Sequence, residues 1–290
     1  MGTSKSYGGP GNRSPLLPPW ADGETSPLPN PNPDTEQPGQ DNPGETSTDP
    51  SSPEHPEIPL QSSNWATTSR YFGGYASGGG GGSLGKALGS YTQSKGGSRQ
   101  ASKSARAGRK STVKLGGFLS NIAANGVRVA TEGLGLASTI LGMPVELALG
   151  AILDAIAPDG ATPDDSSARR AINATLDEMY NRFELGEGNL SKLEAIDSNT
   201  AKELIIFSVT SYIFEKFLQD LQYCFEEGNI AEDEVIRLER EVHPYIEATV
   251  KVELLEKQVN VLTLNWSGTE GQRFCDEIYS QAYALLEDKK

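Results

Sequence analysis

Apolar side chains recur at helical intervals in the C-terminal part of the chain. Between residues 162 and 183 the intervals are four, four, three and four, which places these positions on one helix face: Ala168, Ile172, Leu176, Met179 and Phe183. Thr162 has a side chain suited to a helix cap, and Pro163 suits the first turn. We therefore predict that a helix begins at these two residues.

A longer apolar pattern runs from about residue 200 to 227 and closes at Gly228. Its apolar residues surround most of the helix: Leu204, Ile205, Phe207, Val209, Ile213, Phe214, Phe217, Leu218, Leu221 and Phe225. A helix that is apolar on nearly all sides is buried, so we expect it to be the central helix. Two more helices are predicted over 231–256, broken or kinked near Pro244, and over 269–287.

A sheet is not expected, because no segment alternates convincingly between apolar and polar residues. The one candidate strand is the isolated segment Gln258–Trp266. The pattern therefore predicts an all-α fold, with an acidic helical domain preceded by a long disordered arm rich in Pro, Gly and Ser.

The stretch Phe118–Ile156 is apolar and contains repeated glycines. Part of it, Leu134–Ile156, is long enough to cross a bilayer, but Pro144, Glu146 and Asp154 oppose insertion. We interpret the stretch as two closely packed helices, with glycine permitting the near approach. A membrane-active effector that uses residues 118–156 remains an alternative function, although a membrane partner is not expected.

Composition divides the chain into four parts. Residues 1–20 form a distinct motif, 21–64 an acidic Pro-rich linker, 65–114 a Gly/Ser-rich basic linker and 115–290 the helical domain. Fourteen of the 18 prolines fall within residues 1–59, and such a segment buries too little apolar surface to offset the entropy of ordering. We expect residues 1–110 to be largely disordered.

Charge is sorted in the same way. Residues 1–64 hold 2 basic and 9 acidic residues, residues 65–114 hold 9 basic and no acidic ones, and the remainder holds 14 basic and 30 acidic, so the net charges −7, +9 and −16 sum to −14. The basic segment is a candidate nucleic-acid contact through Arg70, Lys86, Lys95, Arg99, Lys103, Arg106, Arg109, Lys110 and Lys114. The alternative is that it folds back on the acidic domain or keeps a linker solvated.

Catalytic and metal-binding residues are not predicted. The only histidines, His55 and His243, have no partners at metal-ligand spacing. Cys224 and Cys275 lie in helical patterns and are interpreted as buried core thiols of a reducing compartment. The segment Gly80–Ala87 fits the phosphate-binding pattern G-x-x-x-x-G-K but lacks the following hydroxyl residue. We expect no enzyme activity, no cofactor and, without a secretory signal, a cytoplasmic location.

The N-terminal sequence MGTSKS carries a glycine at position 2. Removal of the initiator methionine would expose the Gly2 amine, whose ordinary pKa near 8 leaves a neutral fraction at pH 7. The string also fits the pattern for N-myristoylation. Gly2 is therefore a candidate modification site.

The opening MGTSKSYGGPG, followed by PLLPPWA, resembles the B component of the bacterial Qat anti-phage defence systems. The motif match covers residues 1–21, and beyond it the match is one of layout. The resemblance implies three partners: an ATPase component, an enzyme similar to the deazaguanine-synthesis enzyme QueC, and a nuclease similar to TatD. It also implies that this chain is the non-enzymatic member of the system.

The resemblance suggests a chemical role for the N-terminus. A QueC-like enzyme adenylates a deazaguanine carboxylate, and the Gly2 amine is a nucleophile that can form an amide with it. The residues expected to bind or thread into the partner are Tyr7, Gly8, Gly9, Gly11 and Trp20. The predicted function is thus an interaction protein of anti-phage defence, which binds the ATPase through its helical domain. The alternatives are a nucleic-acid-binding adaptor that uses residues 65–114 and the membrane-active effector.

Overall fold

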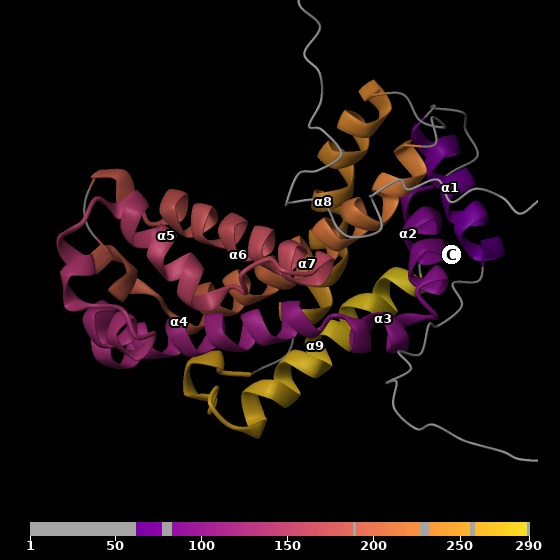
Figure 1. The fold of residues 1–290 in the computed structure, drawn as a ribbon. Coiled ribbons are helices and arrows are strands. Elements are labelled where there is room, and N and C mark those ends of the chain that lie inside the picture. The colour runs from indigo at the N-terminus through magenta and orange to yellow at the C-terminus, as the bar shows by residue number, and fades with distance from the viewer. Residues whose placement is uncertain (1–61, 77–82, 188–189, 227–231, 256–258, 289–290) are drawn as a thin grey trace, which may run out of the picture. The chain divides into compact units, whose positions relative to one another are not determined.

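The computed structural model describes residues 62–76, 83–187, 190–226, 232–255 and 259–288, all within one compact unit, Glu57–Lys290. Within these ranges the fold is all-α, as predicted, and contains no strand (Figure 1). The α-helices are α1 (Ser62–Ala76), α2 (Leu84–Ser94), α3 (Ser98–Ser104), α4 (Arg106–Gly133), α5 (Val145–Ile156), α6 (Pro163–Arg182), α7 (Ser198–Glu226), α8 (Glu232–Leu255) and α9 (Thr269–Glu287). Short 3-10 helices are η2 (Ser138–Gly142), η3 (Leu185–Glu187), η4 (Leu190–Ala195) and η5 (Val261–Thr263).

Helix α7 lies at the centre of the core, as predicted from the apolar residues on nearly all of its sides. It packs against α6, α8 and α4, and its side chains Leu204, Val209, Ile213 and Phe217 are fully buried. The buried face of α6 carries Ala168, Ile172, Leu176 and Met179, four of the five residues that the spacing places on one face. The pattern therefore locates both the central helix and its neighbour.

The start of α6 is built as the sequence indicates. The Thr162 hydroxyl accepts a hydrogen bond from the Asp165 backbone N–H at 3.1 Å, and the Asp165 carboxylate accepts from the Thr162 backbone N–H at 3.1 Å. This reciprocal capping box satisfies two helix-end donors. Asp164 joins the same helix end to α4 and α7, because its carboxylate accepts from the Ala107 N–H at 2.9 Å and from the Tyr212 hydroxyl.

The expectation that residues 65–114 form a linker is wrong for the part that the structure describes. This segment forms α1, α2, α3 and the start of α4, and it buries Phe72, Leu88 and Tyr91 completely. Phe72 and Tyr91 pack on Phe217 of α7, with ring centroids 4.7 and 5.3 Å apart. Glycine and serine obscure the pattern, but a few large side chains are sufficient to dock these helices on the core.

Three local expectations also need correction. Helix α8 continues through Pro244 as one helix, so the predicted break is absent, while the alternative of a kink stays a prediction. The candidate strand contains η5 and no strand in its described residues 259–266. The glycines after α4 do not mediate close packing, since a side chain added at Gly135, Gly142 or Gly150 would meet nothing within 4 Å.

Candidate interaction surfaces

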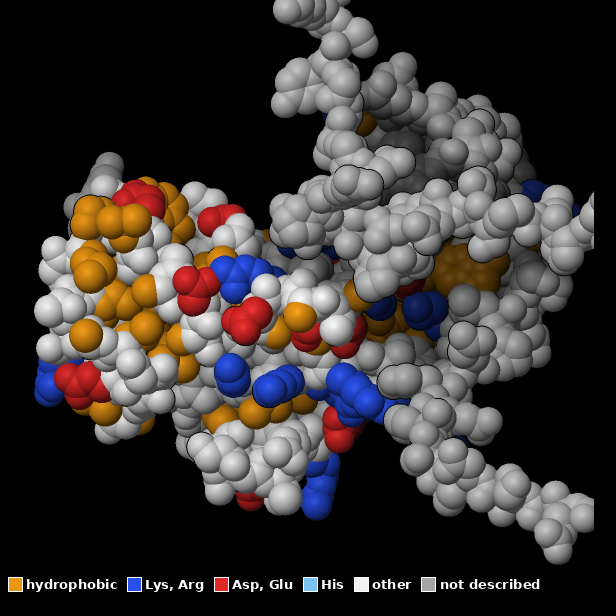
Figure 2. Space-filling model, viewed as in Figure 1, with side chains coloured by type: hydrophobic (Ala, Val, Ile, Leu, Met, Phe, Trp, Pro, Cys, Tyr) orange, Lys and Arg blue, Asp and Glu red, His pale blue; other side chains and the backbone are white. Residues whose placement is uncertain are grey.

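An apolar face is exposed on η2 and the start of α5. Leu141, Met143 and Leu147 are 36%, 46% and 64% exposed, and they lie within seven residues of one another in the sequence. Figure 2 shows hydrophobic side chains gathered over this part of the molecule. Among the described residues the other large apolar side chain with comparable exposure is Ile236 on α8, at 47%. We call Leu141, Met143 and Leu147 the α5 apolar face.

The exposure follows from how α5 is packed. Its opposite side buries Ala148, Ile152 and Ile156, and the helix contacts α6 and α4. Since the helix is apolar on more than one side, packing one side leaves Leu147 in solvent. No helix of the described residues has both the length and the apolar character needed to span a membrane. The face is thus an exposed apolar surface on a short helix of the folded unit.

The nine basic residues of the predicted nucleic-acid contact divide into two groups. Lys95 forms an ion pair with Asp220 of α7 at 2.8 Å, and Arg109 pairs with Asp276 of α9. These two residues bear out, for themselves, the alternative that the basic segment folds back on the acidic domain. The other seven are exposed: Arg70 on α1, Lys86 on α2, Arg99 and Lys103 on α3, and Arg106, Lys110 and Lys114 on α4.

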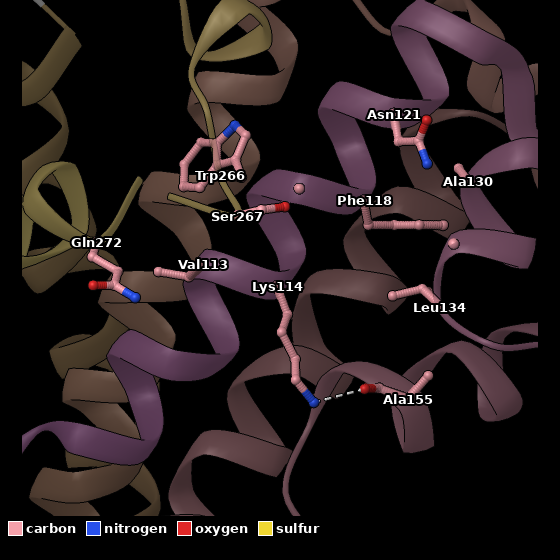
Figure 3. Close-up of a pocket in the computed structure, with 12 residues that line it drawn as sticks. Val113, Lys114, Phe118, Asn121, Ala130, Leu134, Ala155, Trp266, Ser267 and Gln272 are labelled. Carbon is pink, nitrogen blue, oxygen red and sulfur yellow. Dashed lines mark hydrogen bonds between the residues drawn. The ribbon is translucent and has the colours of Figure 1, made fainter. Parts of the chain in front are cut away.

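A groove lies between α4 and the segment that leads into α9. One hollow of about 500 Å³ is lined by both polar and apolar side chains, among them Lys114, Phe118, Asn121, Trp266 and Gln272. Figure 3 shows these residues around the hollow, with the Lys114 ammonium donating a hydrogen bond to the Ala155 carbonyl at 2.9 Å. A second hollow of about 370 Å³ shares Val113, Lys114 and Gln272 with the first, so the two form one groove.

Trp266 fixes the wall of this groove. Its indole N–H donates to the Val261 carbonyl at 2.8 Å, and the side chain is almost completely buried. The ring lies over Gly116 of α4, where an added Cβ would sit 2.4 Å from ring carbons. The absence of a side chain at Gly116 therefore allows the α9 segment to approach α4 closely.

Burial favours the neutral forms of several titratable side chains. Burial raises the pKa of the Cys275 thiol to about 12, so little of the nucleophilic thiolate forms at pH 7. Burial also raises the pKa values of Tyr91, Tyr279 and Tyr283 well above their ordinary range. Burial lowers the pKa of His243, which contacts Ser211 at 3.1 Å and lies edge-on to two phenylalanine rings.

Several residues singled out from the sequence lie outside the described ranges. They are Gly2, Tyr7, Gly8, Gly9, Gly11, Trp20 and His55, and the side chain of Cys224 is likewise not described. In the phosphate-loop-like segment, Ser83 caps α2, Lys86 is exposed and Ala87 is buried. Among the described residues no three His, Cys, Asp or Glu side chains are grouped to hold a metal ion.

A comparison with known protein families identifies the chain. The model for "Qat anti-phage system associated protein QatB" matches residues 96–286, which is most of the chain. The chain belongs to the QatB family. No curated protein and no solved structure matches it. QatB membership confirms the resemblance inferred from residues 1–21. The family match itself lies in the helical residues 96–286.

Membership of the QatB family assigns the chain a role in Qat anti-phage defence. The matched range begins between α2 and α3 and runs almost to the end of α9. It therefore includes the α5 apolar face, the exposed basic residues of α3 and α4, and the groove. Sequence reasoning missed the first of these, because an apolar stretch does not reveal which of its side chains remain uncovered after packing.

Proposed function

We propose that this QatB-family chain is a non-enzymatic component of the defence complex and that its helical domain binds the ATPase component. The observation that carries the proposal is the α5 apolar face. Three large apolar side chains close in sequence are exposed, in a chain whose net charge is −14. Exposed apolar groups of this kind are typical of protein interaction sites.

The test is binding of purified variants to the ATPase component. Leu147→Glu and Met143→Glu place a charge on the apolar face, and each is expected to weaken the complex by at least about 30-fold, the loss for a central contact of about 2 kcal/mol. Both side chains are exposed, so the melting temperature is expected to stay unchanged. Ile236→Glu is the matched control, since it adds the same charge at an exposed apolar site on α8. Equal losses in the three variants would contradict the proposal.

We also propose that Gly2 is the acceptor of a deazaguanine group transferred by the QueC-like enzyme. The enzyme supplies an adenylated carboxylate, and the neutral Gly2 amine attacks its carbonyl carbon. An amide forms as the nitrogen loses a proton to solvent, and AMP leaves with the electron pair of the broken C–O bond. A terminal amine with an ordinary pKa near 8 is neutral far more often at pH 7 than a lysine with a pKa near 10.4. This chemistry supports Gly2 over any lysine of the chain.

Intact mass and tandem mass spectrometry of protein co-expressed with the QueC-like enzyme test this step. The expected result is a mass increase located on Gly2, which disappears in Gly2→Pro while the helical domain melts at the same temperature. Myristoylation at the same atom adds about 210 Da and gives only weak membrane binding. An unmodified Gly2 amine, or the lipid mass, would show that the conjugation proposal is wrong.

A further inference from the structure

A row of exposed basic side chains lies along α3 and α4, and one of them, Lys114, also donates a hydrogen bond to the Ala155 carbonyl. Arg99 and Lys103 are four residues apart on α3, and Arg106, Lys110 and Lys114 follow at intervals of four on α4. All five are exposed, and among the described residues none forms an ion pair with a carboxylate. Figure 2 shows basic side chains in a row over α4. We call these five residues the basic row.

The basic row differs from the neighbouring cations that form ion pairs with carboxylates of the folded unit. Lys95 and Arg109 turn toward α7 and α9 and are neutralised by Asp220 and Asp276. The row keeps its charge in a chain with a net charge of −14. Residues four apart on a helix are about 6 Å apart along its axis, so the α4 part alone presents three cations over about 12 Å. Its charge thus favours an extended polyanion.

The groove beside the row determines which polyanion fits. Lys114 belongs to both features, and the combined hollow reaches along α4 toward Asn121. A hollow of about 500 Å³ is within the range of nucleotide-sized ligand sites, about 300–1,000 Å³. The side chains of Gln272 and Ser267 line it, are exposed, and form no hydrogen bond with another described residue. An amide and a hydroxyl both donate and accept, which suits the edges of bases better than it suits carboxylates.

We propose that the basic row and the α4–α9 groove form a binding site for single-stranded nucleic acid. The row contacts successive phosphates, and the groove receives an unpaired base between the exposed side chains of Gln272 and Ser267. A single strand is required because a duplex keeps the base edges paired and stacked. This site is independent of the α5 apolar face and of Gly2.

Fluorescence anisotropy with the full-length protein and a fluorescein-labelled 20-mer of deoxythymidine tests the proposal. If five phosphates are contacted, log K is expected to fall against log salt with a slope of about −3.5, at about 0.7 per phosphate. Charge reversal in R106E/K110E is expected to weaken binding at least tenfold and to reduce the slope to about −2. The control R70E/K86E reverses two exposed cations on α1 and α2 and is expected to bind as the unmodified chain does.

A second variant separates base contacts from charge. Gln272→Ala is expected to weaken binding about three- to tenfold with the slope unchanged, since no phosphate contact is lost. The absence of binding at 50 mM salt, equal losses in both double variants, or a 20-base-pair duplex bound as tightly as the single strand would overturn the proposal. A 20-residue polyglutamate that competes for binding as strongly as the unlabelled oligonucleotide would also overturn the proposal. The basic row would then recognise negative charge alone, as a site for acidic peptides does.

Discussion

At the residue scale, two adjacent glycines show how closely α4 is packed on the α9 segment. A Cβ at Gly116 would lie 2.4 Å from the Trp266 ring, whereas a Cβ at Gly117 would have its nearest neighbour at 3.4 Å. The first contact is a clash and the second is ordinary packing. The sequence alone does not distinguish these glycines, because the residue that fills the space at Gly116 is 150 positions away.

Gly116→Ala is therefore expected to lower the free energy of unfolding by about 1–3 kcal/mol through overpacking. Gly117→Ala, the matched control, is expected to be neutral or to stabilise by up to about 1 kcal/mol, since alanine favours the helix. Urea unfolding of the two variants measures the difference. Equal stabilities would mean that Trp266 does not lie over Gly116.

Phe217 is one of the α7 residues on which the N-terminal helices pack. It is fully buried against Phe72 and Tyr91, whereas Phe214 on the same helix is only half-buried. Phe217→Ala is expected to destabilise the domain by about 3–5 kcal/mol, and Phe214→Ala by less. Thermal and urea unfolding measure both losses, and the reverse order would contradict this packing.

At the element scale, the α7–α8 contact contains a partly buried titratable group, His243. His243 lies against Phe207 and Phe214, and burial lowers its pKa although Glu215 and Glu247 act in the opposite direction. The unfolded chain therefore binds the proton more readily than the folded chain does. Stability is expected to fall as the pH drops through the unfolded pKa of about 6.5.

His243→Gln is expected to reduce the fall in melting temperature between pH 7.5 and pH 5.5. His55→Gln is the control, because His55 is the other histidine of the chain, and this variant is expected to keep the full dependence. Differential scanning calorimetry at the two pH values checks the result. An identical dependence in His243→Gln and the unmodified chain would assign the effect to other groups.

The helices differ in how well the sequence predicts them. Those with regular apolar spacing and clear caps, α6 above all, begin where the pattern places them. Helices α1 to α3 are not predicted, because their many glycine and serine residues make the apolar pattern hard to recognise. Within α1 the side chains that face the core do recur at intervals of three, four and three: Trp65, Thr68, Phe72 and Tyr75. The groove is not predicted for another reason. It lies between α4 and a segment distant in the chain, and a local sequence pattern does not indicate such a contact.

At the scale of the whole molecule, the folded unit extends further toward the N-terminus than composition suggests. A basic linker over residues 65–114 would offer trypsin nine cleavage sites, whereas in the structure all nine basic residues lie in helices or directly at their ends. Cleavage in helices requires local unfolding. Limited trypsin digestion is therefore expected to leave a product that retains residues 62–288, and a resistant fragment beginning after Lys114 would contradict the fold.

The surfaces of the molecule are segregated by chemistry. The apolar face lies on η2 and α5, and the basic row lies on α3 and α4, while residues 115–290 carry a net negative charge. This separation supports a protein that works by holding partners at distinct places.

Hydrogen–deuterium exchange on the complex with the ATPase component tests the central claim most directly. It reports which backbone amides of the full-length chain become protected when the partner binds. The predicted result is slower exchange in peptides that cover residues 138–150, with no change in peptides around Ile236. Unchanged exchange over residues 138–150 in a complex that is demonstrably formed would show that the α5 apolar face is not the binding surface.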